Sequence, residues 1–148
     1  MVFDGVTTNP RLTSKVLELI PEEVNPIVDR MIKENPAKTD YEIAWEIYKA
    51  ITSEGTKLYM PLFEKSGHKR GYVSAQVDPN QITNIKEMLL QGLELKKLGD
   101  NIMIKCPGSK EGIYVIQILT SLGIPTNSTL VFNVPQAIAV AEAVKKGY

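Results

Sequence analysis

The sequence predicts an α/β fold whose strands are all parallel. Two observations support this: strand-like segments alternate with helical segments along the chain, and no Asn-Gly hairpin turn joins two of the strands. Parallel neighbours need helical crossovers of this kind, which occur in a doubly wound sheet or in a TIM barrel. A length of 148 residues allows one domain with a good core, residues 1–148.

The first strand is predicted over residues 2–9 and is ended by the proline that follows it. Thr13-Ser14 is predicted to cap a short helix that runs to Leu19. A second helix opens with the Pro-Glu-Glu run at residues 21–23, because acids in the first turn interact favourably with the helix dipole, and it ends at Asn35-Pro36.

A third helix is predicted after the cap signal Thr39-Asp40-x-Glu42, where one apolar stripe begins. Residues 58–63 fit either the end of this helix or a linker, and both readings stay open. Residues 64–71 are predicted to be a polar loop because of their glycines and charges. The basic side chains of this loop are compatible with a phosphate contact, although a solvated loop is the commoner explanation.

The remaining segments keep alternating to the end of the chain. The strands show period-two patterns or short apolar runs, and the helices show apolar stripes with capping residues or stop signals at their ends. The predicted order is a strand over residues 72–77, a helix from residue 82 toward Gly99, a strand over residues 101–108, a helix from Ser109 to Gly123, a strand over residues 126–132 and a helix from about residue 134 to 146.

Lys105 stands at the far end of the strand predicted over residues 101–108. Because side chains alternate along a strand, it shares one face with Asn101 and Met103, which we expect to point into an interior. An ammonium group there loses hydration, which favours the free amine that attacks a carbonyl, the chemistry of a Schiff-base lysine. The plainer alternative is that Lys105 pairs with a carboxylate or reaches water at the strand end.

Each predicted strand places a polar side chain near its carboxyl end, namely Asn9, Gln76, Lys105 and Thr129. Barrel enzymes assemble their active sites at this end of the strands, which favours a barrel. Glycine-rich nucleotide-binding and phosphate-binding motifs are absent after every strand, so nucleotide binding loses its best support. The alternative for Asn9, Gln76 and Thr129 is hydrogen bonding that merely closes the strand ends.

Composition and charge disfavour several classes of function. Seventeen basic residues balance seventeen acidic ones without a sustained basic run, so a nucleic-acid or membrane-surface partner has no electrostatic support. One cysteine, Cys106, and one histidine, His68, leave no intrachain disulfide and no Cys/His metal cluster. No segment is apolar over the length of a membrane span, and the start lacks the pattern of a signal peptide. We therefore expect a cytoplasmic protein with no metal and no cofactor.

Four segments together resemble the transaldolase family and the related fructose-6-phosphate aldolases. They occur in the order of the family, at compatible spacing, and cover the chain from about Gly5 to Glu142. The stretch from about Val24 to Tyr59 is longer than in small members and does not match clearly. The segments are VTTNP at residues 6–10, VSAQVD at 73–78, IMIKCP at 102–107 followed by Glu111-Gly112, and GIPTNSTLVF at 123–132 followed by Gln136-Ala137.

The resemblance implies a role for each polar strand-end residue. Lys105 corresponds to the lysine that attacks a ketose carbonyl, and the resulting iminium accepts electrons as a carbon–carbon bond breaks, leaving a dihydroxyacetone unit on the lysine. Asn9 and its neighbour Thr8 correspond to substrate contacts, and Thr129 to the threonine that helps hold a catalytic water. Gln76 stands where large transaldolases hold that water with Glu. An amide cannot accept a proton as a carboxylate does, so transferase and aldolase activity both stay open.

Several parts of the family's barrel are missing from the pattern. An earlier strand supplies an Asp in the family, and Asp4 lies too close to the Thr-Thr-Asn-Pro motif to be that residue. Only four of eight strands can be counted, and an open four-stranded parallel sheet leaves two edges and an inner face uncovered. We therefore expect a partial TIM (β/α)8 barrel of about four parallel units, a truncated half-barrel that forms a homo-oligomer or pairs with a missing segment.

The resemblance implies a transaldolase-like enzyme that transfers a dihydroxyacetone unit between sugar phosphates, of the pentose phosphate pathway type, by a Schiff base. Cleavage of the fructose-6-phosphate aldolase type is the first alternative. A catalytically silent half-barrel that serves only assembly is the second, and another aldolase with a Schiff-base lysine is the third.

Overall fold

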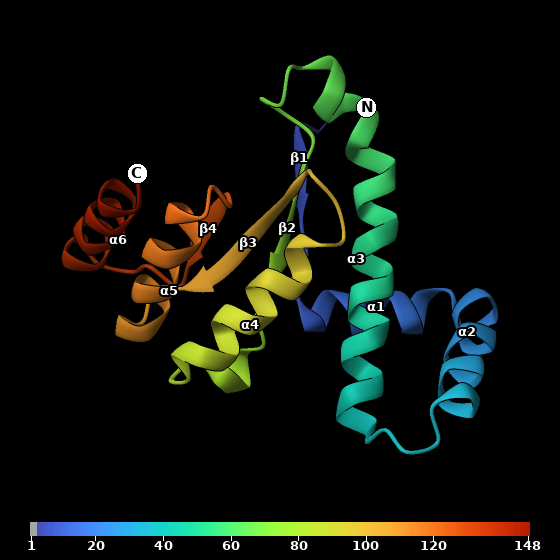
Figure 1. Ribbon diagram of the computed structural model, residues 1–148. Helices are drawn as coiled ribbons and strands as arrows, with labels where there is room; N and C mark the ends of the chain where they lie inside the picture. The colour runs from blue at the N-terminus through green and yellow to red at the C-terminus, as the bar shows by residue number, and fades with distance from the viewer. Residues whose placement is uncertain (1–2) are drawn as a thin grey trace.

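The computed structural model describes residues 3–148, so Val2, the first residue of the predicted first strand, lies outside it. Within that range four parallel strands form one sheet in the order β1-β2-β3-β4 (Figure 1). Strands consecutive in sequence are always neighbours, which is the order of a barrel and not of a doubly wound sheet. The strands are β1 (Gly5–Thr7), β2 (Tyr72–Gln76), β3 (Ile102–Pro107) and β4 (Thr126–Thr129).

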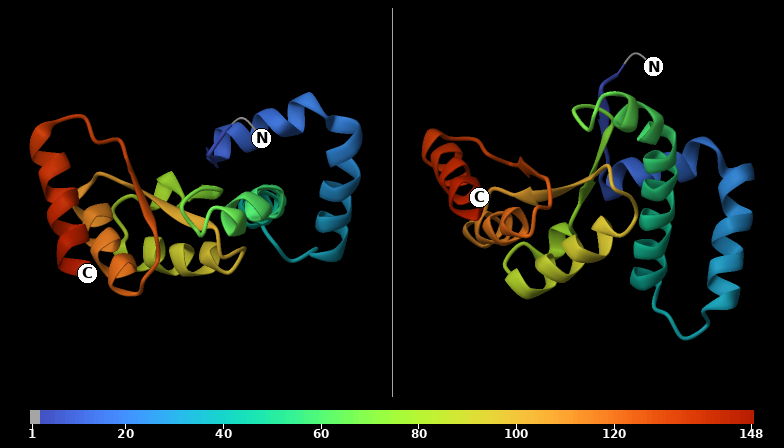
Figure 2. Two further views of the ribbon diagram at one scale, coloured as in Figure 1. Left: turned by 90° about the horizontal axis from the view of Figure 1, so that it is seen from above. Right: turned by 45° about the horizontal axis from the view of Figure 1, so that its top comes forward.

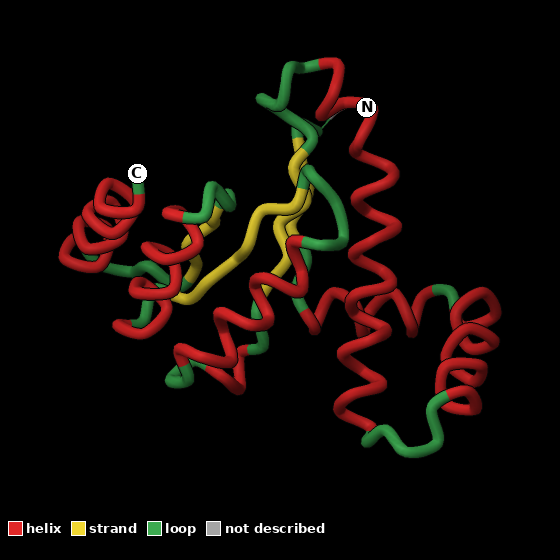
Figure 3. Tube along the Cα trace, in the orientation of Figure 1, coloured by secondary structure: helices red, strands yellow, loops and turns green. Residues whose placement is uncertain are grey.

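Six α-helices and one short 3-10 helix complete the part of the chain that the structure describes (Figure 3). They are α1 (Pro10–Leu19), α2 (Pro21–Glu34), α3 (Asp40–Lys65), η1 (Pro79–Gln81), α4 (Ile85–Lys96), α5 (Lys110–Ser121) and α6 (Val134–Gly147). α3, α4 and α5 pack against the sheet, whereas α2 lies beyond α3 (Figure 1). None of the helices within residues 3–148 combines the length and the apolar character needed to cross a membrane.

The start of α1 differs from the prediction. Thr13-Ser14 does not cap this helix, which begins at Pro10 with Asn9 as its cap; the Oδ1 atom of Asn9 accepts a hydrogen bond from the backbone N–H of Leu12 at 2.9 Å. Pro10 both ends the extended segment and begins the helix, because its fixed φ suits the first helical position and no N–H is needed there. Thr13 is instead a buried residue inside the helix.

The end of α3 settles the ambiguous segment in favour of a helix. Residues 58–63 are helical, and the helix continues to Lys65. Tyr59 and Phe63 lie one turn apart and are both buried, so apolar contact holds the last turns in place. The polar loop is therefore shorter than predicted and begins at Ser66.

Other predicted helix starts are confirmed. Thr39 and Glu42 form a capping box at the start of α3, each side chain bonding to the backbone N–H of the other residue. Ser109 caps α5 as predicted. The last strand is shorter than predicted: β4 ends at Thr129 because Leu130 adopts a left-handed φ of 59°, which interrupts an extended chain.

The two faces of the sheet differ, as the alternation along the strands predicted, although Tyr72 and Met103 lie on the mainly polar inner face and Thr126 and Ser128 on the mainly apolar outer face. The outer face packs against the helices and carries side chains that are each at most 1% exposed: Val73, Ala75, Val77, Ile102, Ile104 and Cys106. The register places polar side chains on the opposite, inner face. These are Thr7, Ser74, Gln76, Lys105, Asn127 and Thr129. The core therefore lies between the sheet and its helices.

The inner face is strongly concave. Asn127 Nδ2 on β4 donates a hydrogen bond to Ser74 Oγ on β2 at 2.9 Å, although β3 lies between these strands. Alternate strands of a flat sheet lie about 9–10 Å apart, whereas the inward side chains of alternate strands meet in layers inside a TIM barrel. This bond and the curl of the sheet (Figure 2) confirm the predicted partial (β/α)8 barrel.

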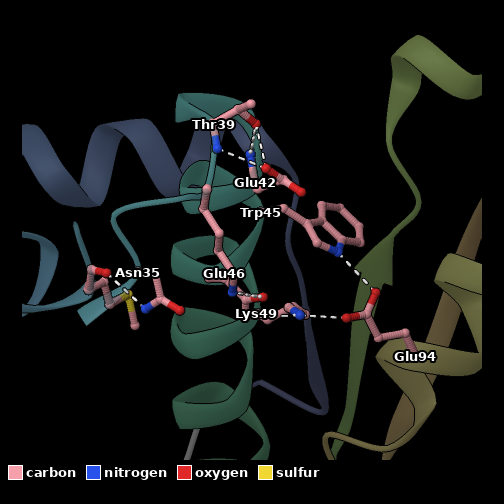
Figure 4. Close-up of polar contacts among 9 residues, drawn as sticks. Asn35, Thr39, Glu42, Trp45, Glu46, Lys49 and Glu94 are labelled. Atoms are coloured by element: carbon pink, nitrogen blue, oxygen red, sulfur yellow. Dashed lines mark hydrogen bonds and ion pairs between the residues drawn. The ribbon is translucent and has the colours of Figure 1, made fainter. Parts of the chain in front are cut away.

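A polar cluster on the outer side fixes α3 to α4 (Figure 4). Trp45 Nε1 donates a hydrogen bond to Glu94 Oε2 at 3.0 Å, and Lys49 pairs with both Glu94 and Glu46. Burial alone would raise the pKa of the Glu94 carboxyl, but the bonds from Lys49 and Trp45 outweigh it and lower that pKa. The cluster therefore joins the helix before β2 to the helix after it.

Asn101 joins the amino-terminal end of the sheet to α3. Its side chain is fully buried, and its Nδ2 donates hydrogen bonds to the carbonyls of Thr56 at 3.1 Å and Gly71 at 2.9 Å. Asn101→Ala removes both hydrogen bonds and takes the side-chain donor from the buried Gly71 carbonyl, so we expect the free energy of unfolding to fall by about 1–3 kcal/mol. Urea unfolding measures this change. The exposed Asn25 of α2 is the matched control, and equal unfolding midpoints for the two alanine variants would contradict the prediction.

Candidate active site

The carboxyl ends of the strands converge on one pocket. Its lining includes Asn9, which follows β1, Gln76 at the end of β2, Lys105 in β3, and Thr129 at the end of β4. The pocket has a volume of about 230 Å³, enough to hold several waters or a small molecule. The structure thus brings together four of the five residues that the sequence proposed for a site.

The parallel register explains why these side chains meet. Gln76 pairs with Lys105 on the neighbouring strand, and Thr129 pairs with Pro107. Residues paired in this way point to the same face of a sheet, here the concave one. The rest of the lining is mostly apolar and consists of Val77, Asp78, Pro79, Ile82, Pro107 and Leu130.

Lys105 lies on the inner face with its side chain half-buried. Within residues 3–148 no carboxylate forms an ion pair with its ammonium group. The carboxylate partner considered as the plainer alternative is therefore absent from the described part of the chain. What the side chain faces instead is the pocket, together with the amide of Gln76 and the hydroxyl of Thr129.

The side-chain amide of Asn9 has two roles, one in the helix cap and one in the pocket. Its Oδ1 atom caps α1 through Leu12 N, while the residue also lines the pocket. Because the oxygen is engaged by the helix, the two N–H groups of Nδ2 are what this side chain has left to donate to a bound molecule. The cap holds the side chain in one place beside the pocket.

Thr8 does not lie with the other four residues. Its hydroxyl donates a hydrogen bond to Tyr48 Oη at 3.0 Å, on the side of the sheet that faces α3, and Thr8 does not line the pocket. Successive residues of an extended chain point to opposite faces, so Asn9 and Thr8 cannot both face the concave side.

Tyr48, on α3, is a positioning residue that no sequence motif singled out. It is 2% exposed, and its Oη accepts hydrogen bonds from Thr8 Oγ1 and, at 2.6 Å, from the backbone N–H of Gln76. Burial raises the pKa of this phenol, so it stays neutral. Tyr48 thus links the ends of β1 and β2 beneath the pocket, a contact across 28 residues that no local pattern reveals.

Tyr48→Phe is expected to lower the free energy of unfolding by about 1–3 kcal/mol, because the N–H of Gln76 loses its buried acceptor. Tyr114→Phe is the matched control, since that ring is 52% exposed on α5 and its hydroxyl is free to bond water. Thermal unfolding of both variants against the wild type measures the difference. A Tyr48→Phe variant as stable as Tyr114→Phe would contradict this role.

Asp78 is a pocket residue to which the sequence motifs gave no role of its own. It is 4% exposed, and both carboxylate oxygens are engaged: Oδ2 accepts a bond from Tyr41 Oη at 2.5 Å, and Oδ1 accepts from Asn80 N at 3.0 Å. Burial and the bond to Asp78 raise the pKa of Tyr41 to about 12. Asp78 therefore caps η1 and shapes the wall of the pocket.

Other reactive groups give no competing centre in the described residues. Burial raises the pKa of the Cys106 thiol to about 12, so this side chain stays protonated and unreactive near neutral pH. Within residues 3–148 no three His, Cys, Asp or Glu side chains are grouped to hold a metal ion. The arrangement is that of an amine facing a small pocket with amide and hydroxyl groups around it.

Comparison with known proteins gives the family. The model of the transaldolase/fructose-6-phosphate aldolase family matches residues 1–148. The chain is 32% identical to a transaldolase of Thiobacillus denitrificans, over 97% of this chain and 40% of the relative. It is 34% identical to a probable transaldolase of Chlorobaculum parvum, over 96% of this chain and 49% of the relative, and 30% identical to a transaldolase of Helicobacter pylori, over 96% and 44%.

These matches extend the resemblance seen in the sequence. They include the stretch from Val24 to Tyr59, which the motifs alone did not match clearly. The chain spans less than half the length of the curated relatives named above, in agreement with four strands of an eight-stranded barrel. With four polar strand-end residues of the family pattern meeting in one pocket of a half-barrel, this chain belongs to the transaldolase/fructose-6-phosphate aldolase family.

Proposed function

We propose that this chain carries the Schiff-base part of a transaldolase-type active site. The observation that supports the proposal is the meeting of Lys105, Gln76, Thr129 and Asn9 in one pocket at the carboxyl ends of parallel strands. An amine without a carboxylate partner, beside a mainly apolar wall, is suited to attack a carbonyl. A ketose phosphate is the substrate class that the family membership supports.

In the proposed reaction the Lys105 amine adds to the ketone carbonyl, and loss of water gives an iminium. The bond between the first and the second carbon counted from the iminium carbon then breaks, and its electrons move into the iminium. The hydroxyl on the departing second carbon loses a proton, so this carbon leaves as an aldehyde. A water held by Gln76 and Thr129 takes this proton. Asn9 donates its amide N–H groups to a substrate hydroxyl.

The three-carbon dihydroxyacetone unit left on Lys105 has two fates. Transfer to another aldehyde is the transaldolase reaction. For this reaction we propose a role in sugar-phosphate metabolism of the pentose phosphate type, in the cytoplasm. Protonation at carbon, followed by hydrolysis of the iminium with one water to give dihydroxyacetone and the free amine, is the aldolase reaction. Gln76 keeps this second candidate open beside the first, because an amide at this position resembles both the aldolases and the small transaldolases of the family. Product analysis with and without an aldehyde acceptor separates the two: transfer consumes the acceptor, whereas cleavage proceeds without it.

Borohydride trapping tests the shared step. The chain is incubated with dihydroxyacetone or fructose 6-phosphate, reduced, and measured by intact mass and peptide mapping. We expect a reduced adduct on the peptide that contains Lys105. A chain that folds and assembles but yields no adduct would instead support a silent assembly module, the remaining alternative.

We propose self-association as part of this function. The four strands leave the concave face, the pocket and both sheet edges without cover in residues 3–148. A homo-oligomer supplies that cover.

A further inference from the structure

We propose that Gln136 is a positioning residue of the pocket: its side-chain amide links the segment after β4 to the end of β3 and thereby holds Thr129 in place. The inference rests on the proposed function, in which Thr129 helps to hold the water that takes the proton, and it names the residue that fixes this hydroxyl. The contacts of the Gln136 amide, a left-handed turn at Leu130 and a close approach at Gly108 support it.

The side-chain amide of Gln136 joins two segments that lie far apart in the sequence. Its Nε2 atom donates a hydrogen bond to the carbonyl of Gly108, 28 residues earlier, at 3.0 Å, and its Oε1 atom accepts one from the backbone N–H of Phe132 at 3.0 Å. The backbone N–H of Gly108 in turn donates to the carbonyl of Thr129 at 2.7 Å. Gly108 is thus held at its N–H by Thr129 and at its carbonyl by Gln136.

The first turn of α6 presents this amide. Asn133 caps the helix, and its Oδ1 atom accepts a hydrogen bond from the backbone N–H of Gln136 at 2.9 Å. The cap fixes the backbone from which the half-buried Gln136 side chain starts. A polar group on a helix is held more precisely than one on a loop. Gln136 is therefore a fixed point against which the two segments are positioned.

The chain between Thr129 and Phe132 turns sharply. Leu130 adopts a left-handed φ of 59°, which is uncommon for a residue other than glycine and persists only where the surrounding structure holds it. The Nε2 atom of Gln136 also lies 3.5 Å from the carbonyl oxygen of Leu130. Thr129 and Leu130 both line the pocket, whereas Gln136 does not. Loss of the amide lets this segment relax toward extended backbone and moves Thr129 within the pocket.

The two segments approach too closely for a side chain where they meet. A Cβ atom added to Gly108 would lie 2.8 Å from Cγ2 of Val131. It would also lie 3.3 Å from the carbonyl oxygens of Thr129 and Leu130. The segment after β4 therefore packs directly on the backbone after β3, so that a shift of one displaces the other. Misplacing a reacting group by about 1 Å can lower a rate about a hundredfold, which is how an amide outside the pocket affects the chemistry inside it.

Gln136→Met tests this role, because methionine keeps the length of the side chain and removes both its donor and its acceptor. The matched control is Gln117→Met, the same change at a half-buried residue of α5 that does not line the pocket. We expect Gln136→Met to lower the rate of fructose 6-phosphate cleavage at saturating substrate at least about tenfold, because the water on Thr129 is misplaced. The yield of borohydride adduct with dihydroxyacetone should stay within about twofold of the wild type, because Lys105 keeps its place on β3.

Hydrogen exchange of single backbone amides, followed by NMR, measures the two hydrogen bonds without any substrate. In Gln136→Met the amides of Phe132 and Gly108 should exchange at least about tenfold faster than in the control. The amide of Ile104, which bonds to the carbonyl of Pro125 at the start of the same strand pair, should exchange at the wild-type rate and show that the variant is folded. Gln136→Glu keeps the acceptor and removes the donor, so only the Gly108 amide should exchange faster.

Each result bears on a separate part of the inference. Exchange of Phe132 and Gly108 at the control rate would overturn the link between the two segments. Faster exchange with an unchanged cleavage rate, or an adduct yield that falls as far as cleavage does, would overturn the positioning role. A wild-type chain that forms no adduct refutes the proposed chemistry instead, and the exchange rates then still decide whether Gln136 holds the segment around Thr129.

Discussion

Replacing Lys105 with methionine is expected to abolish the borohydride adduct and to lower carbon–carbon cleavage by about a thousandfold or more. The proposed iminium cannot form without the amine, and loss of a covalent nucleophile removes the whole pathway and not one contact within it. Methionine keeps most of the length of the side chain, and Lys105 has no ion pair to lose within the described residues. The folded structure should therefore persist, with a change in unfolding free energy below about 1 kcal/mol.

Lys86→Met provides the control for this experiment. Lys86 is an exposed lysine of α4 that does not line the pocket. Its replacement should leave both the adduct and the cleavage rate at wild-type values. If Lys105→Met still formed an adduct that mapped to another lysine, the assignment of the reactive amine would be wrong, whereas the fold would be unaffected.

Gly112→Ala is expected to destabilise the chain by about 3 kcal/mol or more. A Cβ atom at this position would lie 2.1 Å from the carbonyl oxygen of Pro107, which belongs to β3. Neither group can give way cheaply, because the glycine lies in the first turn of α5 and the carbonyl lies at the end of the strand that carries Lys105. Relief requires α5 to move off the sheet, which disrupts a close-packed core. The midpoint of urea unfolding measures the loss.

Gly55→Ala offers the opposite result from the same chemical change. Gly55 lies inside α3, and the nearest atom to an added Cβ is Val73 Cγ1 at 3.6 Å, an ordinary contact. Alanine is the better helix former, so this variant should gain about 0.5–1 kcal/mol. Similar losses for both variants would mean that the close approach at Gly112 does not govern its stability.

Period-two alternation predicted the two faces of the sheet correctly because it follows from strand geometry alone. Gln76, Lys105 and Asn127 do lie together on the concave face, and the apolar side chains that alternate with the first two in β2 and β3 form the core. The start of α1 was missed because Asn9 and Thr13 are both good caps, and only the position of Pro10 decides between them. The length of α3 depended on the burial of Tyr59 and Phe63 against segments far away in the sequence.

The residues of the candidate site that lie at strand ends could be predicted from the sequence. Asn9, Gln76, Lys105 and Thr129 share a pocket because parallel strands end at one edge of the sheet. The supporting residues were not predictable, since Tyr48 reaches Gln76 from a helix and Tyr41 reaches Asp78 across 37 residues. Alternation along residues 6–9 directs the side chains of Thr8 and Asn9 to opposite faces of the sheet. The sequence therefore already indicated that the two side chains could not contact the same bound molecule.

The hydrogen bond between Ser74 and Asn127 bears on what sets the curvature of the sheet. It spans β3 and is made entirely by side chains of the four described strands. The bend of this part of the barrel is therefore fixed from inside, by a strut between alternate strands, and does not depend on the helices alone.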